Sequence, residues 1–181
     1  MTILAAILLA TGATGTSCPA ERAVYSMKEA PGLELRLPRA GPAAGVASDL
    51  YAQLRVPADA DRAAHTIWFQ FTVSNGYQTI RLVPVTDPIA AGEDGPSLLN
   101  EDDEEEDGAL SSVTRFLAFD SDLTTMQDPP RASEAAPAHV LLPDIGLALW
   151  YNGGAFGLTD PAGAATNASV PTALFHRSGC D

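Results

Sequence analysis

Three histidines are the first candidates for chemistry, because imidazole is the side chain whose ordinary pKa lies closest to neutrality. They are His65, His139 and His176, and no two of them form an HxH, HxxxH or HExxH pattern. A metal site or a proton-transfer site would therefore have to be assembled by the fold from distant parts of the chain. Each histidine lies near the end of an expected strand, where a structural or surface role is the ordinary outcome.

The acidic segment 93–108, EDGPSLLNEDDEEEDG, suggests a second chemistry, because calcium prefers carboxylate and carbonyl oxygens. An EF-hand needs alternating ligands, a central glycine and a terminal glutamate, and the consecutive DDEEED run does not have that spacing. A solvated loop held open by charge repulsion is the favoured interpretation. Weak, unspecific binding of a divalent cation such as calcium is the alternative, and no other cofactor is expected. The candidate ligands would be Asp102, Asp103, Glu104, Glu105, Glu106 and Asp107.

Motifs for a nucleophile are missing from the sequence. It contains no GxSxG or SxxK pattern, and Ser74 is better explained as the residue before a turn. Gly153, Gly154 and Gly157 do not form the GxGxxG pattern of dinucleotide-binding folds. The paired carboxylates of a glycosidase, in contrast, leave no pattern in a sequence. A small extracytoplasmic hydrolase, with carboxylates or histidines brought together by the fold, therefore stays an alternative.

The two cysteines, Cys18 and Cys180, enclose nearly the whole expected domain. An even number of cysteines in an exported protein favours a disulfide, and the termini of a domain often lie close together. Closing so long a loop would stabilise the fold by about 4 to 5 kcal/mol on the chain-entropy model. The alternative makes Cys18 the lipid-attachment site of a bacterial lipoprotein, although residues 15–17 fit that pattern poorly. Two distant thiols without a CxxC pair do not form a zinc motif.

Residues 1–17 are expected to be an export signal. From residue 2 to residue 17 the segment carries no charge, and its apolar run 3–10 is too short for a membrane span of about 20 residues. Small residues at positions 13, 15 and 17 suit cleavage, while the usual basic residue near the start is missing. A first apolar strand or core helix is the alternative. Residues 18–181 are therefore expected to form a single periplasmic or secreted domain without a transmembrane span.

The charge of the chain is strongly local. The formal net charge is −13, and nine of the 23 acidic residues lie within 93–107 with no basic residue among them. The overall acidity therefore says little about the rest of the surface. Because the ten basic residues form no cluster, a phosphate backbone has no electrostatic partner here, and nucleic-acid binding is not expected.

Alternating apolar and polar residues predict strands at 33–37 and 50–56, separated by loops at 39–48 and 57–64. The segment 66–83, TIWFQFTVSNGYQTIRLV, predicts a hairpin. If Asn75 and Gly76 form a two-residue turn, Phe71 faces Ile80 and Phe69 faces Leu82 on the apolar side. On the polar side Thr72 would face Thr79, Gln70 would face Arg81, and Trp68 would face Val83.

A second hairpin is expected at 145–158, with Asn152 and Gly153 in its turn and Leu149 facing Phe156. A helix that begins at Asp144 is the alternative, because leucine and alanine also suit a helix. Shorter strands are expected at 23–27, 114–119 and 170–175. The sequence therefore predicts an all-β class: one antiparallel sandwich or barrel-like domain of seven or eight strands, with the acidic segment 93–108 as an inserted loop.

These features favour an exported β-rich binding or structural module whose loops or sheet edge meet an unknown extracytoplasmic protein or small molecule. The hydrolase and the cation-binding loop are the alternatives. Aromatic residues are the candidates for contact with a partner, although a place in the core is the simpler expectation for each. They are Trp68, Trp150 and Tyr151.

Overall fold

The structure is a computed structural model, and it describes residues 18–39, 47–73, 79–91, 114–143 and 145–181. The expected export signal and the acidic segment lie outside the described residues. The strands in the described part are β1 Ala23–Ser26, β2 Glu34–Arg36, β3 Tyr51–Val56, β4 His65–Val73, β5 Ile80–Val85, β6 Leu117–Phe119, β7 Thr125–Met126, β8 His139–Leu141 and β9 Phe175–Cys180. The helices there are the 3₁₀-helix η1 Ala20–Arg22 and the α-helices α1 Pro88–Ala91 and α3 Ile145–Asn152.

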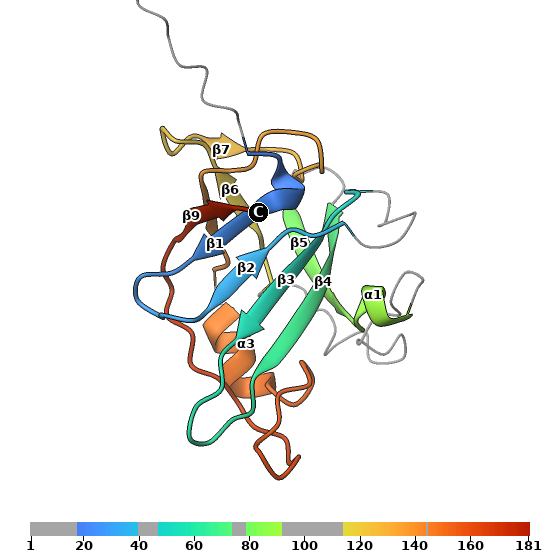
Figure 1. Cartoon of the computed structure of the whole chain (residues 1–181), viewed down its shortest axis with the longest axis vertical. Coiled ribbons are helices and arrows are strands. Elements are labelled where there is room, and N and C mark those ends of the chain that lie inside the picture. The colour runs from blue at the N-terminus through green and yellow to red at the C-terminus, as the bar shows by residue number, and fades with distance from the viewer. Residues whose placement is uncertain (1–17, 40–46, 74–78, 92–113, 144) are drawn as a thin grey trace, which may run out of the picture.

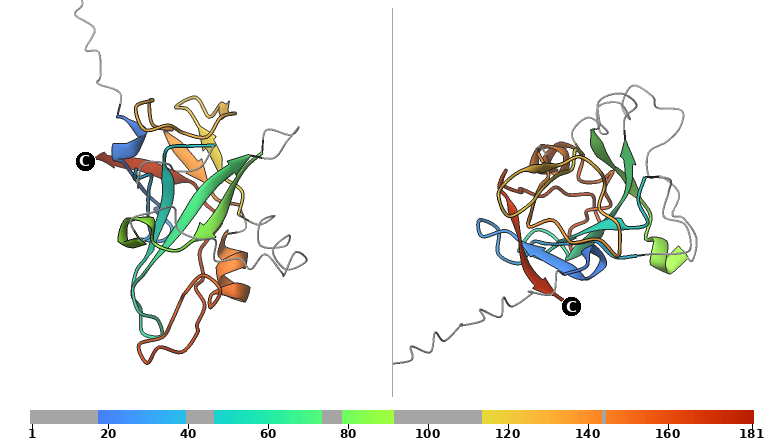
Figure 2. Two further views of the ribbon diagram at one scale, coloured as in Figure 1. Left: turned by 90° about the vertical axis from the view of Figure 1, so that its right-hand side faces the viewer. Right: turned by 90° about the horizontal axis from the view of Figure 1, so that it is seen from above.

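One antiparallel sheet contains these strands in the order β5-β4-β3-β2-β1-β9-β8-β6-β7. The sheet curls into a half-barrel, which is best seen from above (Figures 1 and 2). Two backbone hydrogen bonds link distant parts of the sheet, because Leu82 N donates to Thr114 O at 2.8 Å and Phe116 N donates to Ile80 O at 3.0 Å. The segment that enters β6 therefore also borders β5, which is far from β6 in the strand order.

The expected all-β class is confirmed as a mostly β chain with one curled antiparallel sheet. The described residues form nine strands instead of seven or eight. The additional strands β7 and β8 are only two and three residues long. Alternation over so few residues gives no usable pattern, which explains why they were not predicted.

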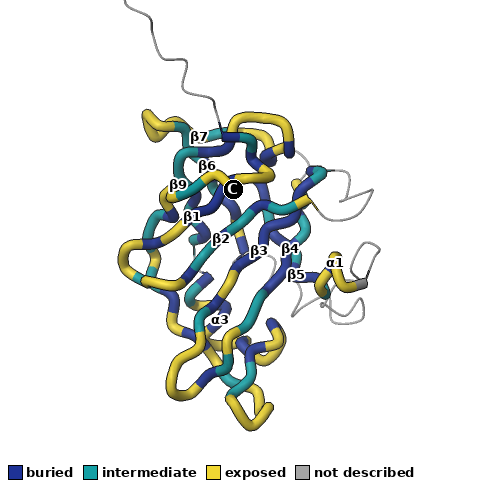
Figure 3. Tube along the Cα trace, viewed as in Figure 1, coloured by how far each residue is buried: buried dark blue, intermediate teal, exposed yellow. Residues whose placement is uncertain are grey.

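The buried residues of the main core gather on the strands in the middle of the molecule (Figure 3). Leu35, Leu54 and Phe69 are fully buried there, each at an alternate position of its strand. Phe71 contacts Phe116 edge to face, with ring centroids 5.0 Å apart, and so packs β4 against the segment before β6. The alternation in the sequence therefore identified the buried face of β2, β3 and β4 correctly.

The hairpin of β4 and β5 is confirmed, but its predicted register is wrong. Phe71 pairs with Leu82 rather than Ile80, and Phe69 pairs with Pro84 rather than Leu82. Each partner lies two residues further along the chain, so the connection between the strands is longer than a two-residue Asn75–Gly76 turn allows. Residues 74–78 themselves lie outside the described part. Because side chains alternate with a period of two, the shift leaves every side chain on its predicted face.

The second predicted hairpin is wrong, because Ile145–Asn152 forms the helix α3. Ile145, Ala148 and Leu149 are buried, and their i, i+3, i+4 spacing marks one helical face. Leucine and alanine favour this helix locally, and packing on the core stabilises it. The strand expected at 170–175 is also displaced, since β9 begins only at Phe175 and pairs with β1 and β8.

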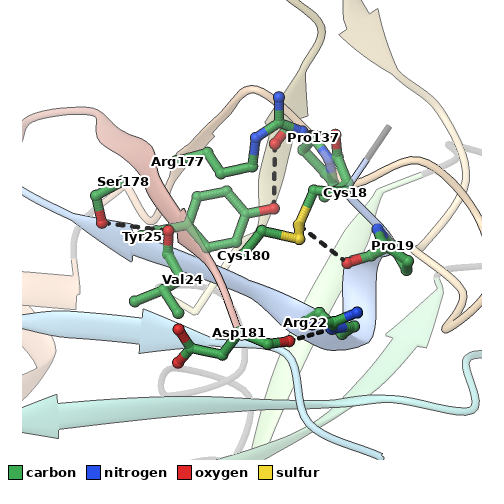
Figure 4. Close-up of a disulfide and its surroundings, with 11 residues drawn as sticks. Cys18, Pro19, Arg22, Val24, Tyr25, Pro137, Arg177, Ser178, Cys180 and Asp181 are labelled. Atoms are coloured by element: carbon green, nitrogen blue, oxygen red, sulfur yellow. Dashed lines mark hydrogen bonds between the residues drawn. A yellow bond between two sulfur atoms is a disulfide. The ribbon is translucent and has the colours of Figure 1, made fainter. Parts of the chain in front are cut away.

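The predicted disulfide is present between Cys18 and Cys180, whose Cα atoms lie 5.8 Å apart (Figure 4). It joins residues separated by 162 positions. Cys180 lies at the end of β9, where it pairs with Ala23 at the beginning of β1. Because the Cys18 sulfur is bonded to Cys180, that atom is not available for a thioether to lipid. Tyr25, buried nearby, donates its hydroxyl to Pro137 O at 3.1 Å, and burial raises the pKa of this phenol above its ordinary value.

Candidate functional site

A pocket of about 410 Å³ opens at the beginning of β4. It lies between the first residues of β4, the end of β5 and the loop that follows α3. Its lining residues are His65, Thr66, Ile67, Trp68, Val85, Thr86, Asp87, Phe156 and Gly157.

The pocket exists because β4 is longer than β5. β3 pairs with β4 from His65 to Gln70, whereas β5 pairs only with residues Trp68 to Val73. Residues 65–67 consequently have no β5 partner on that side of the strand. Phe156 and Gly157, from the loop after α3, approach this part of β4 and leave the pocket between themselves and residues 85–87.

His65 is the histidine that the pocket contains. Its side chain is half-buried, and burial lowers its pKa below the ordinary value of 6.5, with an opposing hydrogen bond to the backbone of Phe156. The lowered pKa favours the neutral ring, in which one nitrogen is a donor and the other an acceptor. Gly157 has a φ of +78°, and a Cβ atom there would lie 3.0 Å from His65 Nε2. The glycine thus allows the close approach of the loop to the ring.

Trp68 forms the wall of the pocket at β4, and only 4% of its surface is exposed. It pairs with Val85 on β5, not with Val83 as predicted. Its ring contacts Tyr51 edge to face, with centroids 6.4 Å apart. Together with Val85, these two aromatic residues form a second small cluster on the side of the sheet opposite the main core. Trp68 therefore supports the pocket as a largely buried side chain.

Polar groups at the end of β5 form the opposite wall. Asp87 Oδ1 accepts hydrogen bonds from Ile89 N at 2.9 Å and Ala90 N at 3.1 Å, and so caps the short helix α1. Thr86 Oγ1 is buried without a hydrogen-bond partner. Because its carboxylate is engaged by backbone donors, Asp87 serves the structure at this site.

The other aromatic candidates lie outside the pocket. Trp150 and Tyr151, on α3, are 51% and 73% exposed, so the expected core role does not apply to them. Leu147 on the same helix is 53% exposed. The i, i+3, i+4 spacing places these three side chains along one face of α3. They form an exposed apolar face near the loop that carries Phe156 and Gly157.

His139 and His176 lie together on β8 and β9, away from His65, with their Nδ1 atoms 3.0 Å apart. The sequence did not predict this pair, because β8 was not expected and β9 was placed too early. Within the described ranges no group of three or more His, Cys, Asp or Glu side chains is arranged to hold a metal ion. The acidic candidates lie outside those ranges: Asp102, Asp103, Glu104, Glu105, Glu106 and Asp107.

A second hollow of about 380 Å³ lies at the other end of β4 and β5. Its described lining has no titratable side chain; the residues are Ala47, Gln70, Phe71, Thr72, Val73 and Val83. The His65 pocket is therefore the better candidate for a site with hydrogen-bonding chemistry.

Comparison of the chain with known protein families, characterised proteins and solved structures found no match. No described helix is both long enough and apolar enough to cross a membrane.

Proposed function

We propose that the chain is an exported binding module that takes a small, neutral and largely apolar ligand in the His65 pocket. The pocket itself is the observation that carries this proposal. Its volume of about 410 Å³ lies within the range of about 300 to 1,000 Å³ that is usual for small-molecule sites. The disulfide supports an extracytoplasmic location, since such bonds persist in oxidising compartments.

The chemistry of the lining argues for a neutral ligand. Ile67, Trp68, Val85 and Phe156 provide apolar surface. A neutral His65 uses its single N–H in the hydrogen bond to the backbone of Phe156, so it offers a ligand one acceptor nitrogen and no charge to pair with an ionic group. An uncharged molecule with an apolar body and a hydroxyl group would match both properties.

A small hydrolase is the second candidate, because His65 and Asp87 line the same pocket. A neutral imidazole can act as a general base when a hydroxyl or water lies within hydrogen-bonding distance. Asp87, however, already caps α1, and the described part of the lining contains no serine or cysteine. A hydrolase would therefore need a nucleophile and a free carboxylate that the described lining does not provide, whereas a binding site needs neither.

Tryptophan fluorescence tests the binding proposal directly. The chain contains two tryptophans, so Trp150→Phe leaves Trp68 as the single reporter in the pocket wall. Benzyl alcohol and cyclohexanol are suitable probes, as neutral molecules with an aromatic and an aliphatic body. We expect a saturable change of the Trp68 emission with at least one of them.

Two matched substitutions in this background locate the response. Thr66→Phe fills the mouth of the pocket, whereas Thr72→Phe makes the same change on the same face of β4, next to the second hollow. The response should disappear in the first variant and persist in the second. Equal responses in both folded variants, or no saturable response before the substitutions, would contradict the proposed site.

A further inference from the structure

His139 and His176 form a directly opposed pair on neighbouring strands, outside the pocket of the proposed function. They are cross-strand partners in the β8–β9 register. Arg177 N donates to Ala138 O at 3.0 Å, so the adjacent pair 139/176 occupies a non-hydrogen-bonded position of the antiparallel ladder. Side chains come closest at such positions. The backbone therefore brings these two imidazoles together.

Both rings point away from the core. Their neighbours Val140 and Phe175 are fully buried, and successive side chains of a strand point to opposite faces. His176 is exposed and His139 is partly exposed. The two ring planes stand at 83° to each other, with centroids 4.9 Å apart. The pair is consequently accessible to a dissolved ion.

The separation of the two Nδ1 atoms matches that of two nitrogens on one metal ion. Bonds of about 2.0 to 2.1 Å and angles between square-planar and tetrahedral place two such ligands about 3 Å apart. The observed distance is 3.0 Å. Rotation about χ2, which is a broad torsion in histidine, would turn both lone pairs toward a common point.

The proton between the rings does not prevent binding. When the two Nδ1 atoms share an N–H···N hydrogen bond at 3.0 Å, one of them carries a hydrogen. If that ring changes its tautomer, the proton is transferred through water from Nδ1 to Nε2. Both Nδ1 lone pairs then become available without a net loss of protons.

We propose that His139 and His176 form a two-nitrogen chelating site for a divalent transition metal, with water as the remaining ligands. Imidazole nitrogen suits copper, nickel and zinc, and affinity for a given set of ligands is highest for Cu²⁺. The absence of a third protein ligand among the described residues leaves open positions on the metal. The site therefore favours Cu²⁺ over Ni²⁺ and Zn²⁺.

Titration of the full chain with Cu²⁺, followed by calorimetry and electron paramagnetic resonance, tests this site. We expect one copper with a spectrum split by two equivalent nitrogens. His139→Gln and His176→Gln should each weaken binding by about tenfold or more, since even loss of an outer partner of a metal ligand costs about 10- to 100-fold. The double variant measures copper bound elsewhere on the chain.

Thermal unfolding gives an independent measurement. Copper bound to both strands of the folded protein should raise the melting temperature of the wild type but not of the double variant. The melting temperatures without metal show whether the variants still fold. Equal copper affinity in the wild type and in a folded double variant, or a spectrum with a single nitrogen ligand, would overturn the proposal.

Discussion

At the scale of single residues, His65 acquires its chemistry from its surroundings. Its position near the start of a predicted strand gave no indication of a pocket, because the pocket depends on where β5 ends and on the loop at Phe156. Burial, rather than a sequence motif, lowers its pKa. The same limitation applies to His139 and His176, which are adjacent only through the register of two strands.

The depressed pKa of His65 predicts a pH dependence of stability. The unfolded state binds the His65 proton more readily than the native state, so this residue lowers stability as the pH falls from about 6.5 through its native pKa. In urea unfolding, His65→Gln should therefore lose less stability than the wild type between about pH 7.5 and pH 5. An NMR titration of the ring with a midpoint at or above 6.5 would contradict this.

Gly157 should be more sensitive to alanine than Gly163. Both have positive φ values, +78° and +89°, so either substitution should cost about 1 to 2 kcal/mol for left-handed backbone. Only at Gly157 would the new Cβ also meet His65 Nε2, at 3.0 Å, whereas nothing lies within 4 Å at Gly163. We expect Gly157→Ala to lose about 1 kcal/mol more in urea unfolding. Equal losses would show that the loop is not held against the ring.

At the scale of elements, the sequence predicted the faces of the long strands better than the connections between them. Alternation in β3 and β4 identifies the buried side, because a one-residue slip would expose the core. It does not fix a shift of two residues, which is why the β4–β5 register was wrong. α3 was predicted as a hairpin because an Asn-Gly pair resembles a turn, while its packing partner Val170 is distant in the sequence.

Gly146 tests the packing of α3. In an isolated helix, Gly→Ala would be favourable by about 1 kcal/mol. Here a Cβ at Gly146 would lie 2.0 Å from Val170 O, so the helix or the backbone at Val170 would have to move. We expect Gly146→Ala to be destabilising by about 2 to 3 kcal/mol in urea unfolding.

Leu147→Ala is the control for Gly146→Ala, because Leu147 lies on the same helix and is 53% exposed. It should change stability by less than about 0.5 kcal/mol. A stabilising effect of Gly146→Ala would mean that α3 does not pack against Val170 as described.

At the scale of the whole molecule, Cys18–Cys180 joins the segment just before η1 to the last strand, β9, across 162 positions. The even number of cysteines in an expected exported chain and their places near the two ends of the domain predicted this bond. The Cys18→Ala/Cys180→Ala double variant should lose up to about 4 to 5 kcal/mol in urea unfolding, because its denatured chain is no longer constrained. A loss below about 1 kcal/mol would show that the bond contributes little to the stability of the half-barrel.

The proposed function depends on a chain that is exported and closed by this disulfide. The most direct measurement is the intact mass of the protein recovered from its own host, with and without a reductant. We expect a chain without residues 1–17 that gains the mass of two hydrogen atoms on reduction. A chain that keeps residues 1–17 and does not change mass on reduction, or one with a lipid on Cys18, would contradict it.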